Sequence, residues 1–148
     1  MKASSLWQPW ATLVALNEKR IETRSWPTSY RGPLAIHAAK KMTNELARLT
    51  WLTEPFASVL HKHGLESLPR GCVVATCELV GCKLIPEIPT VWHTPMGDWT
   101  MTEQEIAFGD YTPGRYAWLL ADIVALPGPV PARGAQGLWE WRPEGVGA

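Results

Sequence analysis

The sequence predicts an α+β fold that is mainly β, in the form of a compact mixed sheet or small barrel. About six strand-like segments, rich in β-branched and aromatic residues, are separated by turn signals. Short helical segments interrupt them without the regular alternation of strand and helix that marks a parallel α/β protein. The length of 148 residues fits one domain with its own hydrophobic core, so we expect residues 1–148 to form a single domain.

The first third of the chain predicts three strands around one helix. The strands are expected at residues 5–8, 20–26 and 32–40. A helix is expected over residues 9–19, because Pro9 suits the first helical position and apolar side chains follow at helical spacing. Pro27 marks the turn between the second and third strands.

The remaining chain predicts two more helices, two long strands and a short final strand. Helices are expected over residues 43–52 and 55–64, with Thr43 or Asn44 as a cap of the first and Gly64 closing the second. Strands are expected at residues 71–85, 115–126 and 138–143. Residues 86–114 contain four prolines and predict irregular structure around a short helix at 102–109.

The charge distribution favours a small anionic ligand or a short stretch of nucleic acid. The formal net charge is zero, which argues against a protein that coats nucleic acid by bulk attraction. Residues 1–48, however, carry eight Lys or Arg against three Glu, a net charge of +5, and residues 49–148 carry −5. Such a local basic surface on a neutral chain suits a limited contact with phosphate.

Composition and the N-terminus predict a cytoplasmic protein without a cofactor. The first ten residues contain no apolar run of signal-peptide length, and no later stretch approaches a membrane span. Three cysteines without a signal indicate reduced thiols. Their spacing of five residues differs from that of zinc-binding pairs, so we expect no metal site.

The segment KRIETRSWPTSYRG, from Lys19 to Gly32, is the strongest candidate for a binding surface. On an ideal strand, Glu22 and Arg24 share one face, and Trp26 follows directly behind them. Phosphate-contacting arginines and stacking aromatic rings occur together in nucleic-acid sites. The alternative is a solvated strand face on which neighbouring charges stabilise one another.

Two further segments offer candidate ligand contacts. Trp7 and Gln8 precede the first predicted helix, and Gln8 carries both the donor and the acceptor needed to bind a base edge. The alternative is that Gln8 caps the helix and that Trp7 or Trp10 packs in the core. His37 lies in an apolar strand, where it is either a core residue with satisfied hydrogen bonds or part of a pocket wall.

Lys19 and Glu22 form the best candidate pair for acid–base chemistry. A lysine among other cations can have a lowered pKa and so act as a base or nucleophile. An ideal strand would point these two side chains to opposite faces, so the pairing requires a bulge or a helix-to-strand transition.

These residues together resemble the ASCH family (the activating-signal-cointegrator homology domain). The resemblance rests on Gln8-Pro9-Trp10-Ala11, on the K-x-x-E-x-R core of Lys19, Glu22 and Arg24 followed by Trp26, on Arg31-Gly32, and on Ile36-His37-Ala38. The later segments GDYTPGRYAWLLADI and GAQGLWEW are similar to the closing strand and tail of bacterial and phage members.

The resemblance implies a PUA-like fold, a small β-barrel with flanking short helices, whose cleft holds RNA or a nucleotide. Carried over by position, it implies a cleft formed by Gln8, Lys19, Glu22, Arg24, Trp26 and His37, with Tyr116 and Trp118 from the closing strand. One bacterial relative resembles an N4-acetylcytidine amidohydrolase that uses a lysine and a threonine three residues later. Glu22 occupies that threonine position in this chain, which counts against the same mechanism.

The sequence therefore predicts a module that recognises RNA, single-stranded nucleic acid or a modified or flipped base in a basic, tryptophan-lined cleft. Arg24 and Lys19 would hold phosphate, while Trp7 or Trp26 stacks on the base. One alternative is a hydrolase, either an amidohydrolase or a ribonuclease, with Lys19 and Glu22 as catalytic residues. Another is a protein-interaction adaptor whose exposed tryptophans anchor a partner.

Overall fold

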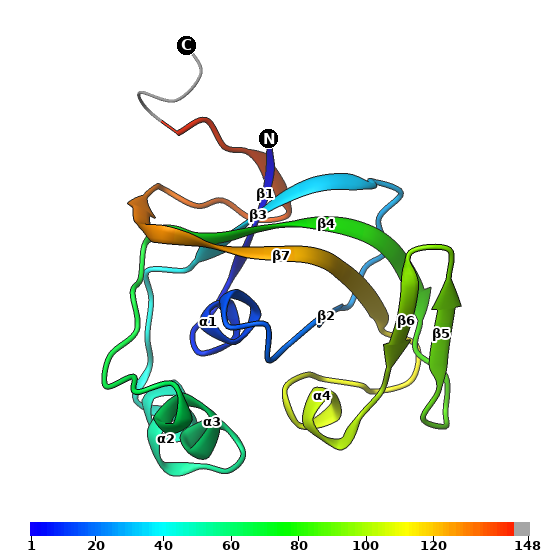
Figure 1. Ribbon diagram of the computed structural model, residues 1–148, viewed down its shortest axis with the longest axis horizontal. Helices are drawn as coiled ribbons and strands as arrows, with labels where there is room; N and C mark the ends of the chain where they lie inside the picture. The colour runs from blue at the N-terminus through cyan, green and yellow to red at the C-terminus, as the bar shows by residue number, and fades with distance from the viewer. Residues whose placement is uncertain (144–148) are drawn as a thin grey trace.

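A curled six-stranded sheet forms the framework of the protein, and the computed structural model describes residues 1–143 of it (Figure 1). The strands are β1 (Lys2–Leu6), β2 (Ile21–Arg24), β3 (Gly32–Ala38), β4 (Cys72–Leu84), β7 (Tyr116–Pro131) and β8 (Leu138–Glu140). Their order across the sheet is β2-β7-β4-β3-β1-β8. Strand β1 is parallel to β3, and every other neighbouring pair is antiparallel. The predicted α+β, mainly β fold is confirmed as a half-barrel of the PUA-like type.

The curl of the sheet comes from its two longest strands. The register between β4 and β7 shifts at three places, and each shift marks a bulge or irregularity. Bulges bend a strand and increase its twist. Strand β7 also continues past its predicted end at residue 126, through three prolines. They are tolerated because β2 pairs only with residues 116–119, which leaves the later part of β7 without that neighbour.

Helix α1 (Trp10–Ala15) lies in the hollow of the curled sheet (Figure 1). Its buried Ala11 and Val14 pack against the inward-facing residues of β3, β4 and β7. The helix is shorter than the predicted 9–19 because Asn17 adopts φ 58°, a left-handed conformation that ends the helix. The amides of Glu18 and Lys19 both donate to the Leu13 carbonyl, so Lys19 lies in a helix-to-strand transition.

Three further helices cover the open side of the half-barrel: α2 (Asn44–Leu52), α3 (Phe56–Lys62) and α4 (Glu103–Ala107). The predicted N-cap of α2 is confirmed, since the Thr43 hydroxyl accepts a hydrogen bond of 3.1 Å from the Leu46 amide. Gly64 follows α3 with φ 70°. Helix α3 contributes Phe56 to an apolar cluster with Leu13 and Phe108.

Residues 86–114 contain a hairpin that the sequence did not predict. Strands β5 (Val91–Thr94) and β6 (Gly97–Thr100) pair antiparallel beside the main sheet. Trp99 anchors the hairpin, because its buried ring packs near Ile21 and its Nε1 donates to the Leu120 carbonyl at 3.0 Å. The prolines around the hairpin obscured its short strands, so the prediction of irregular structure for 91–100 is corrected.

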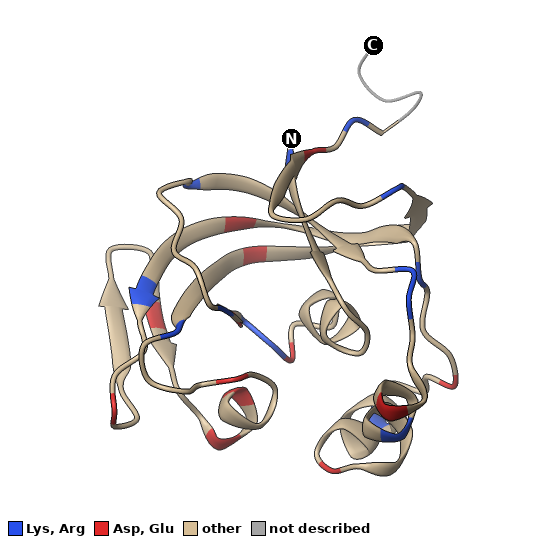
Figure 2. Ribbon diagram, turned by 180° about the vertical axis from the view of Figure 1, so that it is seen from behind, with Lys and Arg blue, Asp and Glu red and all other residues tan. Residues whose placement is uncertain are grey.

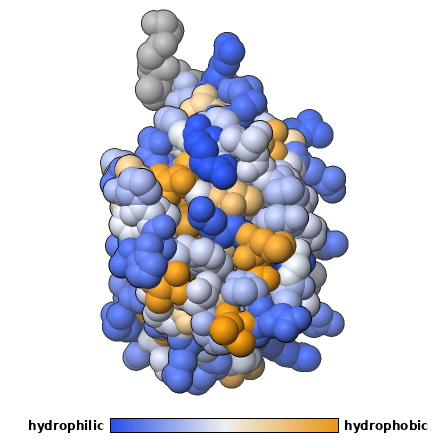
Figure 3. All heavy atoms as spheres, turned by 90° about the vertical axis from the view of Figure 1, so that its right-hand side faces the viewer, coloured by the Kyte–Doolittle hydropathy of each residue, from blue (hydrophilic) through white to orange (hydrophobic). Residues whose placement is uncertain are grey.

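Hydrophobic side chains on the hairpin side of the molecule occur in separate groups among hydrophilic ones (Figure 3). All nine tryptophans lie in the described residues, and only Trp7, at 41% relative exposure, is an exposed one. In the described part of the chain, no helix is long and apolar enough to cross a membrane. Within the same residues, no cluster of three or more His, Cys, Asp or Glu side chains could hold a metal ion.

Glu18 links the end of α1 to α3 and α4, and this contact predicts an acid-sensitive contribution to stability. Its carboxylate accepts hydrogen bonds from Lys62 (2.8 Å), His63 (3.1 Å) and Gln104 (2.9 Å). These bonds, the one from Lys62 first, lower the pKa of Glu18 from 4.5 to about 2. Because the folded-state pKa is lowered, the stabilisation is present above pH 4.5 and is lost as the pH falls through 2.

We therefore expect Glu18→Gln to lower the melting temperature by about 2–4 °C at pH 7 and by progressively less as the pH falls below 4.5. Thermal unfolding followed by circular dichroism at pH 7, 5 and 3 measures this difference. Glu66→Gln, at an exposed carboxylate outside the helices, is the matched control and should show no such convergence. A constant gap between wild type and Glu18→Gln at all three pH values would contradict the assignment.

Candidate functional site

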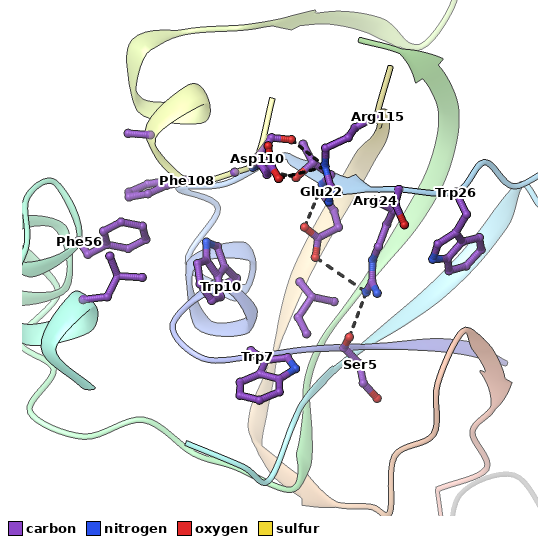
Figure 4. Close-up of a pocket in the computed structure, with 16 residues that line it drawn as sticks. Ser5, Trp7, Trp10, Glu22, Arg24, Trp26, Phe56, Phe108, Asp110 and Arg115 are labelled. Atoms are coloured by element: carbon purple, nitrogen blue, oxygen red, sulfur yellow. Dashed lines mark hydrogen bonds and ion pairs between the residues drawn. The ribbon is translucent and has the colours of Figure 1, made fainter. Parts of the chain in front are cut away.

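A cavity of about 560 Å³ opens between β2, the junction of β1 with α1, and the segment after α4 (Figure 4). Its charged lining residues are Glu22, Arg24, Asp110 and Arg115. Its aromatic lining residues are Trp7, Trp10, Trp26, Phe56 and Phe108. Two carboxylates and two guanidinium groups therefore lie among aromatic rings in one hollow.

Arg24 is fixed from behind by strand β1. Its Nη2 donates to the Ser4 hydroxyl at 2.8 Å and to the Ser5 carbonyl at 3.0 Å. The guanidinium carbon lies 5.8 Å from the centroid of the Trp118 ring, within the range of a cation–π contact. The Arg24 Nε is buried and has no hydrogen-bond partner among the described residues. The guanidinium is thus held in place while part of its donor capacity stays unused.

Glu22 presents one carboxylate oxygen that is not fully used by the protein. Its Oε1 accepts a hydrogen bond of 2.9 Å from the Thr23 amide. Its Oε2 lies 3.9 Å from the Arg24 Nη2, which is an ion pair but too long for a hydrogen bond. The carboxylate lies between Trp10 and Arg24 in the cavity (Figure 4). Oε2 can therefore accept a hydrogen bond from a ligand.

Aromatic rings border these polar groups on two sides (Figure 4). On one side the edge of Trp10 meets Phe56, with ring centroids 6.1 Å apart and an interplanar angle of 88°. On the other side Trp26 meets Trp118 at 4.8 Å and 87°. Such edge-to-face contacts hold the rings in fixed orientations. Trp7, the exposed tryptophan, lies at the rim.

Asp110 and Arg115 form the second charged pair of the lining. The Arg115 Nε lies 3.5 Å from Asp110 Oδ2 and donates to the Asp110 carbonyl at 3.1 Å. Hydrogen bonds from the Thr112 hydroxyl and amide, with a smaller contribution from Arg115, lower the pKa of Asp110. The Asp110 amide in turn donates to Thr23 on β2 at 3.1 Å, which ties this loop to the strand that carries Glu22.

Lys19 is fully buried and does not line the cavity. Its Nζ donates to the Phe108 carbonyl at 2.9 Å and forms no ion pair with any described residue. Burial lowers the pKa of Lys19, against the opposing effect of Glu22 and Glu105. The contact instead fixes the linker before β2 to Phe108, which does line the cavity.

Gln8 is also fully buried and used by the protein itself. Its Nε2 donates to the Thr12 hydroxyl at 2.8 Å and to the Pro69 carbonyl at 2.7 Å. Its Oε1 accepts from the Thr12 amide at 3.0 Å. The side chain thus caps α1, which is the alternative that the sequence left open.

Apart from His37, the structure separates the remaining sequence-predicted residues into two groups. Trp7, Glu22, Arg24 and Trp26 line the cavity together, as the resemblance implied for the last three. Trp118 is buried beneath Trp26, to whose carbonyl its Nε1 donates at 3.4 Å, and Tyr116 packs half-buried against the same core.

His37 lies away from this cavity, in the wall of a second groove of about 1000 Å³. Its Nε2 lies 2.8 Å from the Ala132 carbonyl, and since a carbonyl only accepts, Nε2 carries the proton. The other ring nitrogen, Nδ1, lies 3.0 Å from the Ser5 hydroxyl. The same hydroxyl also accepts a hydrogen bond from Trp139 Nε1 at 3.2 Å. Both ring nitrogens are thus bonded to the protein.

Sequence reasoning missed four charged or aromatic contributors to the cavity, which are Phe56, Phe108, Asp110 and Arg115. Phe56 gives only the pattern of a core residue. Asp110 and Arg115 flank the Pro113-Gly114 turn inside GDYTPGRY, a segment that carried the family resemblance but no assigned role. The juxtaposition of this turn with β2 depends on the pairing of β2 with β7, which no local pattern reveals.

The family model for the ASCH domain matches residues 5–126. The chain belongs to the ASCH domain family. It is 34% identical over 83 residues to activating signal cointegrator 1 of Homo sapiens and equally to that of Mus musculus. These matches cover 53% of this chain and only 14% of each relative. At the level of the family, this membership indicates association with nucleic acid.

Gly134 packs closely against the His37 ring, so a larger side chain at this position should disturb the wall of the groove. A Cβ at this position would lie 2.5 Å from His37 Cε1 and 2.7 Å from Ser5 Oγ. We expect Gly134→Ala to lower the free energy of unfolding by about 1–3 kcal/mol, as overpacking does in closely packed sites. Gly128→Ala, where a Cβ meets nothing within 4 Å, is the matched control. Equal stability of the two variants in urea unfolding would argue against this packing.

Proposed function

We propose that the cavity binds one unpaired base of a nucleic acid, with RNA as the expected source. Glu22 accepts a hydrogen bond from an amino group of the base, and Arg24 donates to a neighbouring carbonyl or ring nitrogen. Trp7 or Trp26 stacks on the base. The observation that carries this proposal is the free acceptor oxygen of Glu22 beside a fixed guanidinium, between two aromatic walls.

The charge of the cavity supports a base rather than a phosphate as its occupant. Glu22 and Asp110 balance Arg24 and Arg115, so the lining has no excess of positive charge. A phosphate group would be repelled by the carboxylates, whereas a base edge offers both donors and acceptors to such a pair of side chains. Aromatic rings stack on bases of every kind and stabilise each by about 1–3 kcal/mol.

A single-stranded or flipped nucleotide is the form that fits a cavity of this kind. Sequence-specific RNA recognition uses unstacked bases that stack on aromatic side chains and pair through their edges. A base inside a duplex cannot reach Glu22, which is only 14% exposed. Membership of the ASCH family supports nucleic acid as the class of ligand.

The two alternatives find less support. A hydrolase that uses Lys19 needs this amine to reach the substrate, and its side chain is buried and bonded to Phe108. Incubation with N4-acetylcytidine, followed by chromatography for released cytidine, tests that alternative. An adaptor anchored by several exposed tryptophans has only Trp7 available among the described residues.

Matched pairs of nucleotides test the proposal. Cytidine and uridine 5′-monophosphate differ in the exocyclic group at C4 and in the proton that uridine carries on N3. Adenosine and inosine 5′-monophosphate differ in the same way at C6 and N1. We expect the amino member to bind more tightly in whichever pair the cavity accepts. In Glu22→Gln, the amide oxygen can replace Oε1 and accept the hydrogen bond from the Thr23 amide. The amide NH₂ then takes the place of Oε2 and faces the amino group of the base, so that two donors meet. We expect this variant to lose about tenfold in affinity for the amino member, since an unpaired buried donor costs about 1–3 kcal/mol.

Isothermal titration calorimetry on wild type and Glu22→Gln measures these affinities. Glu87→Gln removes an exposed carboxylate that lines neither the cavity nor the groove, and it should bind like wild type. Indifference of wild type to the amino group in both pairs, or unchanged binding by Glu22→Gln, would refute the proposed role of Glu22.

A further inference from the structure

The second groove gathers four basic side chains from three separate segments. Lys40 and Lys41 follow β3, Arg70 precedes β4, and Arg133 follows β7. In Figure 2, several Lys and Arg segments gather on the right-hand side of the view, where the chain leaves the sheet toward the helices. No Asp or Glu is present among the described residues that line this groove. Its charge therefore contrasts with the balanced charge of the cavity.

These cations are left without a carboxylate partner within the described residues. All four side chains are exposed, and none forms an ion pair with a carboxylate of residues 1–143. The Arg70 Nη1 donates to the Lys40 carbonyl at 3.0 Å, which ties two of the segments together. Positive charge that is held in one groove and left unpaired attracts an anion with several charges.

The groove and the cavity are neighbours that share two wall residues. Ser5 and Trp7 line both hollows. The Ser5 carbonyl accepts from Arg24 of the cavity, and the Ser5 hydroxyl bonds His37 of the groove. Lys41 Nζ lies 5.9 Å from the centroid of the Trp7 ring, so a basic group of the groove meets the stacking ring at the cavity rim.

We propose that this groove binds the phosphodiester backbone of the nucleotides next to the base in the cavity. The inference rests on the proposed function and extends it: the ligand is a single-stranded oligonucleotide and not a free nucleoside. The cavity reads one base, while Lys40, Lys41, Arg70 and Arg133 contact phosphates without regard to sequence.

The rest of the groove wall suits a sugar–phosphate chain. Much of it is formed by Ala and Gly residues, which let a backbone approach closely. His37 has both ring nitrogens bonded to the protein, so it shapes the wall and leaves ligand binding to the four cations.

The double variant Lys40→Gln/Arg133→Gln tests the groove and leaves the contact between Lys41 and Trp7 in place. Its binding to the nucleoside cytidine, which carries no phosphate, reports on the cavity, and its binding to the single-stranded octamer rC8 reports on cavity and groove together. We expect cytidine affinity to match wild type and rC8 affinity to fall at least about tenfold at 0.1 M salt. The slope of log affinity against log salt should become shallower by about 1.4, or roughly 0.7 for each lost phosphate contact.

A second double variant controls for net charge. Lys83→Gln/Arg48→Gln removes two exposed cations that lie outside the groove and form no ion pair within residues 1–143. It changes the net charge by the same amount and should bind rC8 within about twofold of wild type, since screening weakens distant charges. Binding of dC8 with the same dependence on Lys40 and Arg133 would support phosphate as the group that is recognised.

Two outcomes would overturn the inference while leaving the proposed function intact. One is that the groove variant still binds cytidine in the cavity and also binds rC8 with the affinity and the salt slope of wild type. The other is equal binding of an octamer of glutamate that also depends on Lys40 and Arg133, which would make the groove a site for acidic peptides. Failure of wild type to bind any mononucleotide is a different result and contradicts the proposed function.

Discussion

The hydrogen bonds from Arg24 to Ser4 and Ser5 hold together the two ends of the curled sheet. Strand β2 is one edge of the sheet, and β1 lies four strands away, beside the opposite edge. A side chain of β2 can reach β1 only because the bulged β4–β7 pair bends the sheet into a half-barrel. The same two bonds fix the guanidinium beside Glu22, so the closure of the fold and the geometry of the cavity depend on one side chain.

Buried polar residues that do not line the cavity help to hold its wall in place. Lys19 fixes the linker before β2 to Phe108, and Glu105 Oε2 accepts from the Arg20 amide at 2.7 Å. Burial raises the pKa of Glu105, while Lys19 opposes the rise. Gln8 fixes the start of α1 through its hydrogen bonds to the hydroxyl and the amide of Thr12. Gln8 and Lys19 belong to the segments on which the family resemblance rests, yet they act on the positions of ligand-facing residues and do not line the cavity.

Local patterns in the sequence predicted the strands of the main sheet and the four helices of the described residues, because each has a clear period and clear breakers. Period-two alternation also placed Glu22 and Arg24 on one face of β2, and the structure confirms this alternation in their burial. Patterns failed where structure depends on distant pairing. The hairpin β5–β6 is stabilised by Trp99 under the main sheet, and Asp110 and Arg115 join the cavity through the β2–β7 pairing. Only half of the basic groove could be recognised in the sequence. Lys40 and Lys41 are adjacent there, whereas Arg70 and Arg133 are brought to them by the fold.

The placement of a base in the cavity can be tested by following the nine tryptophan indole N–H resonances by NMR during titrations with cytidine and with adenosine 5′-monophosphate. Three rings line the cavity, those of Trp7, Trp10 and Trp26, and their resonances should shift together in a saturable manner. Those of Trp51, Trp92 and Trp99, which line neither hollow, should stay in place. Saturable shifts confined to the second set, or no shift in the first, would contradict the proposed site.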